Sequence, residues 1–161
     1  MTNEKQLAVK MALDLWNSRV KATDELIDSL TDEQLQKEVS SGRNRGIYLL
    51  GHLTAVNDAM LPLLGFEKQN YPQLNDAFLT KPDKAIAELP SAKDLRAYWK
   101  ASNAKLAEHF GKLKPEEWFE KHTSVSAEDF VKEPHRNRLN VVMGRTVHLS
   151  SHLGQLVFLK N

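Results

Sequence analysis

The sequence predicts an all-α protein, a four-helix bundle with a long crossover connection between helices 2 and 3. Three observations lead to this prediction. Long stretches carry apolar residues at the helical period, no stretch alternates apolar and polar residues as a strand would, and the 7 glycines and 6 prolines gather between the helical stretches. A chain of 161 residues is long enough to bury a core, and we expect residues 1–161 to form one domain.

The first predicted helix runs from about Asn3 to Leu30. A step of about 100° per residue places one apolar stripe along it. The stripe consists of Ala8, Met11, Ala12, Leu15, Ala22, Leu26 and Leu30. Arg19 falls in the middle of this stripe, and two interpretations stay open. Either its stem packs while its head reaches water, or it points at a polar cavity or at a carboxylate across an interface.

The second long helix is predicted from about Ile47 to Leu64, after a short helix that Thr31 and Gln34 would open as a capping box. Its apolar stripe comprises Leu49, Leu53, Val56, Met60 and Leu63. His52 lies at the edge of this stripe. The residues on the opposite side are Gly51, Thr54 and Asp58.

A connection from Gly65 to Pro90 precedes the third helix, and connections this long in a compact domain tend to be functional or to cross it. Ser91 can cap the third helix. The fourth helix spans about Arg138 to Lys160, with Asn137 as its cap. Between these two helices, the segment from Phe119 to Arg136 has mixed character, and we expect it to form a loop or a short irregular element.

Composition excludes several classes of function. With 22 basic and 21 acidic residues the net charge is +1, so no basic excess indicates nucleic-acid binding. No run approaches the roughly 18 apolar residues of a membrane span, and the polar N-terminus is not typical of a signal peptide, so we expect a cytoplasmic protein without a membrane partner. Because the chain has no cysteine, a metal site must use histidine nitrogen and oxygen, and any thiol must come with a substrate.

The fourth helix carries a polar stripe beside its leucine-rich face. The stripe consists of Arg145, His148, Ser151, His152 and Gln155, without the lysines and glutamates of a usual solvent face. His148 and His152 are four residues apart, so both imidazoles can face one metal ion, although most such pairs in helices are uncoordinated. His52 is the natural third ligand, and the alternative for it is a hydrogen-bonded core histidine.

Other polar residues are weaker candidates. Gln155 and Ser151 could fix the imidazole tautomers or could be ordinary bonding partners in the bundle. Arg145 could hold an anionic group of a substrate, or could form a salt bridge near the start of its helix. Surface or loop positions are expected for the remaining histidines, and two acidic residues before the fourth helix could reach the metal. These residues are His109, His122 and His135, and Glu128 and Asp129.

Two stretches together resemble the DinB-like (DinB/YfiT-like) metalloenzyme superfamily: "YLLGHLTAVNDAML" (48–61) and "HLSSHLGQL" (148–156). The resemblance covers nearly the whole chain. It implies a four-helix bundle, often homodimeric, that binds a divalent ion, usually nickel or zinc, through His52, His148 and His152. Some relatives are transferases or isomerases that use small bacterial thiols, and others have no known activity. Many members carry an acidic residue or histidine inside the C-terminal motif, whereas residues 149–151 here are leucine and two serines.

Two functions follow as hypotheses. The first is a metal-dependent enzyme, a thiol-dependent transferase or a hydrolase acting on a small molecule, with no catalytic acid or base assigned. The second is a non-catalytic dimeric bundle that acts as a stress-related binding module. The fold alone cannot choose between them.

Overall fold

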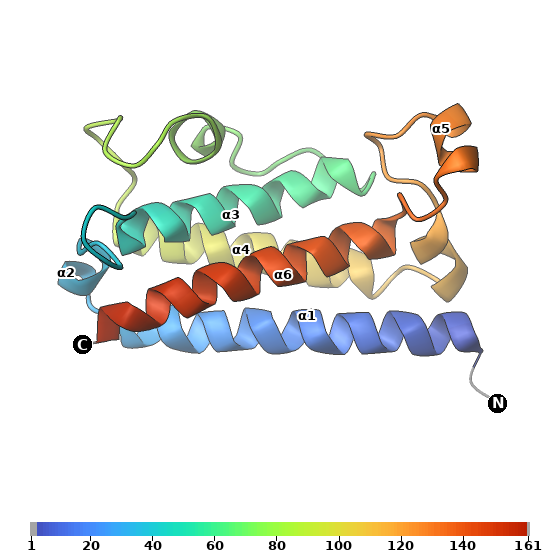
Figure 1. Cartoon of the computed structure of the whole chain (residues 1–161), viewed down its shortest axis with the longest axis horizontal. Helices are drawn as coiled ribbons and strands as arrows, with labels where there is room; N and C mark the ends of the chain where they lie inside the picture. Colours follow the sequence, from blue (N-terminus) through green and yellow to red (C-terminus); the bar gives the residue numbers. More distant parts are fainter. Residues whose placement is uncertain (1–2, 161) are drawn as a thin grey trace.

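The computed structural model describes residues 3–160, which form a bundle of four long helices. These are α1 (Glu4–Ser29), α3 (Gly46–Leu63), α4 (Ala92–Phe110) and α6 (Arg138–Leu156). Helices α1 and α6 run in one direction, and α3 and α4 run in the other (Figure 1). Because α3 and α4 are parallel, the connection between them must return along the bundle, as a crossover does. The predicted fold class is confirmed.

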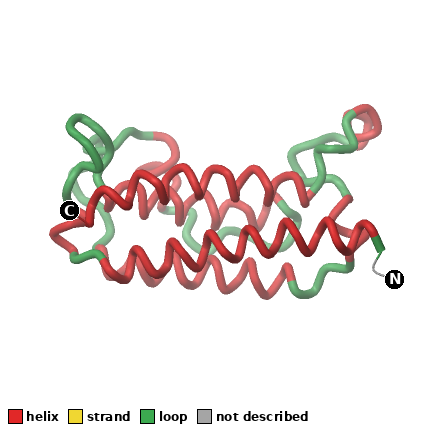
Figure 2. The backbone as a smooth tube through the Cα atoms, turned by 60° about the horizontal axis from the view of Figure 1, so that its bottom comes forward, coloured by secondary structure: helices red, strands yellow, loops and turns green. Residues whose placement is uncertain are grey.

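Short elements lie between the long helices or follow the last of them, toward the two ends of the bundle (Figure 2). They are α2 (Asp32–Leu35), the π-helical turn η1 (Asp76–Thr80), the 3₁₀ turn η2 (Pro115–Phe119), α5 (Ala127–Lys132) and the 3₁₀ turn η3 (Val157–Lys160). The helix predicted to run from Arg138 to Lys160 therefore ends as an α-helix at Leu156 and tightens into η3.

The predicted helix starts are confirmed by their caps. The side chain of Thr31 accepts the N–H of Gln34 in a full capping box. The side chains of Ser91 and Asn137 cap α4 and α6 by accepting one backbone N–H each, from Asp94 and Asn140. These bonds satisfy amide groups that the first turn of a helix leaves without partners.

Helix α3 lies at the centre of the core, packed against α4, α6 and η1. Most of its apolar residues are buried, and so are Thr54 and Asp58 on the opposite side, whereas Leu63 at the end of the predicted stripe is only partly buried. The Asp58 carboxylate accepts the backbone N–H groups of Asn70 (3.1 Å) and Tyr71 (2.8 Å). The buried charge thus fixes the start of the crossover connection on α3, which is how a buried carboxylate is usually satisfied.

The end of the crossover is fixed on α3 by a second set of contacts. Arg45 donates to the Asp83 carboxylate (2.7 Å), and the side chain of Asp83 is only 5% exposed. The Tyr48 hydroxyl donates to the carbonyl oxygen of Lys81 (2.7 Å). With both ends held, η1 lies against α3.

The predicted apolar stripe of α1 is wrong in part. Met11 and Leu15 are 64% and 56% exposed, whereas Val9, Trp16 and Ile27 reach the core. The apolar residues of α1 spread over two faces, and the face with the bulkier side chains, which includes Trp16, packs inward. The other face joins exposed apolar residues of α6 on the outside of the bundle.

Within residues 3–160, no helix is both long enough and apolar enough to cross a membrane.

Candidate metal centre

The structure brings the three predicted histidines together between α3 and α6. Nε2 of His148 lies 3.0 Å from Nε2 of His52 and 3.1 Å from Nε2 of His152. One nitrogen from each ring can be chosen so that all lie within 4.8 Å of one another. All three side chains are partly buried. The group lies toward the end of the bundle where α3 begins and α6 ends.

Hydrogen bonds on the far side of two rings define their tautomers. Nδ1 of His52 lies 2.8 Å from the carbonyl oxygen of Phe78, which can only accept, so Nδ1 carries the proton. Nδ1 of His152 lies 2.8 Å from Oε1 of Gln155 and donates to it in the same way. Both Nε2 atoms therefore direct a lone pair toward His148, which is the arrangement that outer-shell partners impose on metal-binding histidines.

The donor set fits a divalent transition metal. Two nitrogens that bind one ion at about 2.0–2.1 Å lie roughly 2.9–3.4 Å apart when the N–metal–N angle is about 90–109°. The distances from Nε2 of His148 to Nε2 of His52 and of His152, 3.0 and 3.1 Å, lie in this range. Without a cation or a shared proton, lone pairs at this distance would repel. Imidazole suits zinc and nickel, and the three rings leave room for further ligands.

The carbonyl of Phe78 reaches His52 because η1 packs closely on α3. The Phe78 side chain is fully buried against Gly51. A Cβ atom on Gly51 would lie 2.5 Å from Cδ1 of that ring and closer still to two other ring atoms, so a glycine is required at this position. Sequence reasoning missed Phe78; the available signal was a glycine directly before the histidine on a buried helix.

Burial keeps two of the rings neutral. Desolvation lowers the pKa of His148 to about 4, and the neighbouring His152, His52 and Arg145 act in the same direction. Desolvation also lowers the pKa of His52, more than its hydrogen bond to Phe78 raises it. Neutral imidazole is the form that binds metal, so these rings need not lose a proton first at neutral pH.

Tyr48 supports the ring of His52 from one side. The two rings are stacked, 6.3 Å between centroids and 9° between planes. Burial raises the pKa of Tyr48, and its hydroxyl is committed to the carbonyl of Lys81. Tyr48 therefore orients the site and stays protonated.

The weaker candidates on α6 have different roles in the structure. Gln155 holds His152 as described, whereas the Ser151 hydroxyl donates to the carbonyl of Val147 (3.1 Å). Arg145 lies on the stripe beside the histidines and forms no salt bridge within the part of the chain that is described.

The remaining candidates lie elsewhere. His109 bonds to Glu67 (3.0 Å), and His122 accepts the N–H of Ser124. His135 is exposed in the loop before α6. Glu128 pairs with Lys132 on α5, and α5, which also carries Asp129, lies at the end of the bundle where α3 finishes (Figure 1).

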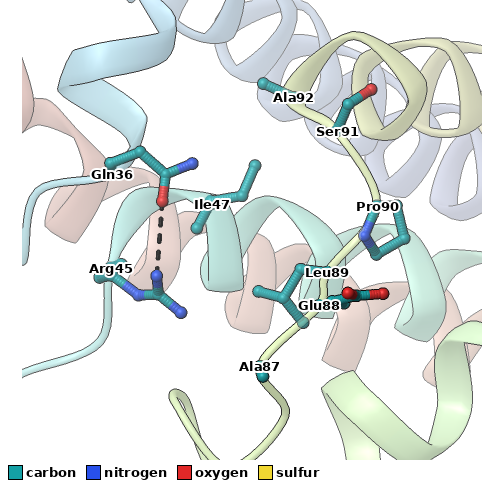
Figure 3. A pocket seen from close by; sticks show the side chains of 9 residues that line it. All are labelled: Gln36, Arg45, Ile47, Ala87, Glu88, Leu89, Pro90, Ser91 and Ala92. Atoms are coloured by element: carbon teal, nitrogen blue, oxygen red, sulfur yellow. Dashed lines mark hydrogen bonds between the residues drawn. The ribbon is translucent and has the colours of Figure 1, made fainter.

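Two hollows lie near the opposite end of the bundle, where α3 begins and α6 ends. The larger, about 390 Å³, lies between Gln36 and Arg45 on one side and residues 87–92 on the other (Figure 3). None of the three histidines lines it, and Arg45 is already paired with Asp83. A smaller hollow of about 210 Å³ lies between residues 39–44 and Gln155, so it adjoins the outer partner of His152.

Comparison with protein families supports the resemblance noted in the sequence. The model of the DinB superfamily matches residues 16–156, which contain the second half of α1, all of α3, α4 and α6, and the three histidines. A comparison with curated proteins gave no match. Since the family match covers most of the chain, this protein belongs to the DinB superfamily.

Proposed function

We propose that the protein is a metal-dependent enzyme that holds nickel or zinc through His52, His148 and His152. One observation carries the proposal: nitrogens of three rings from two helices converge, at 3.0 and 3.1 Å from Nε2 of His148. Two of the rings are held in the metal-binding tautomer by Phe78 and Gln155. A site that served only packing would not need both protons to be held away from the centre.

The chain's own residues orient the site. His52 is held between the Phe78 carbonyl and the ring of Tyr48, and His152 is held by Gln155. A bound divalent ion would polarise a carbonyl group or lower the pKa of a coordinated water or thiol. Within residues 3–160, no carboxylate joins the three-histidine group, and none is among the causes that lower the pKa of His52 or His148.

The reaction that we propose is the transfer of a group to or from a small thiol. Hydrolysis is the other metal-dependent reaction that we consider. Membership of the DinB superfamily supports a metal-dependent reaction. The chain has no cysteine, so the thiol would belong to the substrate. The cytoplasmic location stays a prediction that accords with a small-thiol substrate.

We further propose that the protein works as a homodimer through the outer face of α1 and α6. Between Arg138 and Leu156, the exposed positions of α6 carry no charge. A hollow of about 440 Å³, lined almost entirely by apolar side chains, lies between this face and α1. Its large exposed members are Met11, Leu15, Met143 and Val147. Contiguous apolar surface of this kind typically marks a protein contact, and a second copy is the partner that the family suggests.

Metal analysis of the purified protein tests the site. The wild type should hold about one equivalent of nickel or zinc per chain after loading and desalting. His52→Ala should lose most of that metal, because it removes one of three nitrogens. His109→Ala is the matched control, since this histidine bonds to Glu67 instead. Equal, near-zero metal in the wild type and in both variants would refute the proposal and favour a binding module without a metal.

A further inference from the structure

Arg145 lies beside the three histidines. It precedes His148 by one turn of α6, so both side chains lie on the same face of the helix. Its guanidinium group is partly buried, and its charge lowers the pKa of His52 and of His148. A positive charge is therefore held close to the rings on both helices.

Within residues 3–160, this guanidinium has no counter-ion. Burial alone lowers the pKa of Arg145, and neither a hydrogen bond nor an acidic neighbour acts against it. The salt bridge that could have explained Arg145 near the start of its helix is not formed.

Arg19 is half-buried too, and within residues 3–160 its guanidinium bonds only to the Ser18 hydroxyl. Three other half-buried arginines show the partners that such a group usually has. Arg45 pairs with Asp83, Arg96 bonds to Asp32 and to a backbone carbonyl, and Arg138 bonds to Glu120 and to two carbonyls. Their side chains are about 20% exposed. Placing a guanidinium in a partly dry site without an anion costs free energy, so an unpaired one beside a candidate reaction centre calls for a ligand.

We propose that Arg145 binds a carboxylate group of the substrate while the reacting atom of the same molecule lies at the three histidines. The planar guanidinium presents two parallel N–H groups, which match a carboxylate. This inference rests on the proposed metal site and narrows its substrate to small molecules that carry a carboxylate. The substrate's negative charge replaces the protein carboxylate that the site lacks.

Thiol binding to the cobalt-loaded protein tests the inference without an activity assay. Thiolate coordination to cobalt gives a charge-transfer absorption that can be titrated. Mercaptopropionate carries a carboxylate where mercaptopropanol carries a neutral hydroxyl, and the two thiols are similar in size. In the wild type the carboxylate thiol should bind about tenfold or more tightly than the neutral one. In Arg145→Gln this preference should fall to within about twofold, and Arg145→Lys should keep part of it.

Two controls locate the effect. Arg145→Gln should retain its cobalt and its affinity for mercaptopropanol, which shows that the site is intact. Arg43→Gln removes an exposed arginine that lines the small hollow beside Gln155, and it should keep the full preference.

The outcomes are distinct. An equal preference in wild type and Arg145→Gln, or a loss in Arg43→Gln alone, would overturn the role of Arg145 and leave the metal site standing. If the wild type binds no cobalt, the proposed function fails, and this inference fails with it.

Discussion

Replacing Gly51 by alanine should damage the metal site without touching any histidine. The added Cβ would overlap the buried ring of Phe78, three atoms of which lie within 2.5 Å of it. Forcing an extra methyl group into a packed core costs about 1–3 kcal/mol. Alanine in place of glycine in a helix recovers about 1 kcal/mol. The difference is a net loss of about 0–2 kcal/mol in the free energy of unfolding. Since the Phe78 ring is fully buried and cannot swing into solvent, we expect the upper half of that range.

The same substitution should weaken metal binding. When the Phe78 ring moves away from α3, its carbonyl leaves Nδ1 of His52, and losing an outer-shell partner of a ligand costs about 10- to 100-fold in affinity. Urea unfolding of the metal-free protein and competition with a chelator measure the two effects separately. Adding Phe78→Leu removes two of the overlapping ring atoms and should restore part of the stability. Unchanged stability together with unchanged metal affinity in Gly51→Ala would refute this account of how η1 positions the site.

Three further predictions concern the hydrogen bond from His152 to Gln155, the ion pair that holds the end of the crossover, and the outer face of α1 and α6. Gln155→Ala should raise the metal Kd about tenfold, because it frees the proton-bearing nitrogen of His152; chelator competition measures this, and an unchanged Kd would remove Gln155 from the site. Burial raises the pKa of Asp83, but hydrogen bonds from Arg45 outweigh this effect and hold the pKa below its usual value. The stabilisation by this pair, about 1–3 kcal/mol, should therefore be present above the unfolded pKa of about 3.9 and be lost as the pH falls through the folded value. Unfolding of Asp83→Asn should then show a deficit at pH 7 that shrinks below about pH 4, and a deficit independent of pH would contradict the assignment. Val147→Glu should convert a dimer to a monomer in light scattering, whereas a monomeric wild type would contradict the proposed interface.

The long helices and their caps could be predicted from the sequence because their signals are local. Thr31 and Asn137 each cap the helix that follows them, and the spacing of His148 and His152 fixes their common face. The pairing with His52 needed more than spacing. It followed from a histidine at the edge of an apolar stripe and from the family resemblance.

The parts that could not be predicted depend on main-chain groups and on competing faces. The partner of His52 is a backbone carbonyl in a π-helical turn. Every residue has a backbone carbonyl, so the sequence does not indicate which one will contact the histidine. Helix α1 carries apolar residues on two faces, so periodicity identified amphipathic character but not the face that packs inward. Met11 and Leu15 satisfy the helical period and still point outward, which is understandable if the second face is covered by another chain.

The absence of a base beside the histidines bears on the choice of reaction. The Tyr48 hydroxyl donates a hydrogen bond to a carbonyl oxygen, and His52 and His152 hold their protons on the outward nitrogens. Among residues 3–160, no carboxylate influences the pKa of His52 or His148. A nucleophile at this site would have to lose its proton without help from a side chain. Free water is a far weaker acid than a free thiol, whose pKa is about 8.5, and since a bound ion would lower the pKa of either, water would still need such help more than the thiol. The same site supplies a positive charge in Arg145 that suits an anionic substrate. Together these features favour a thiol transfer over a hydrolysis.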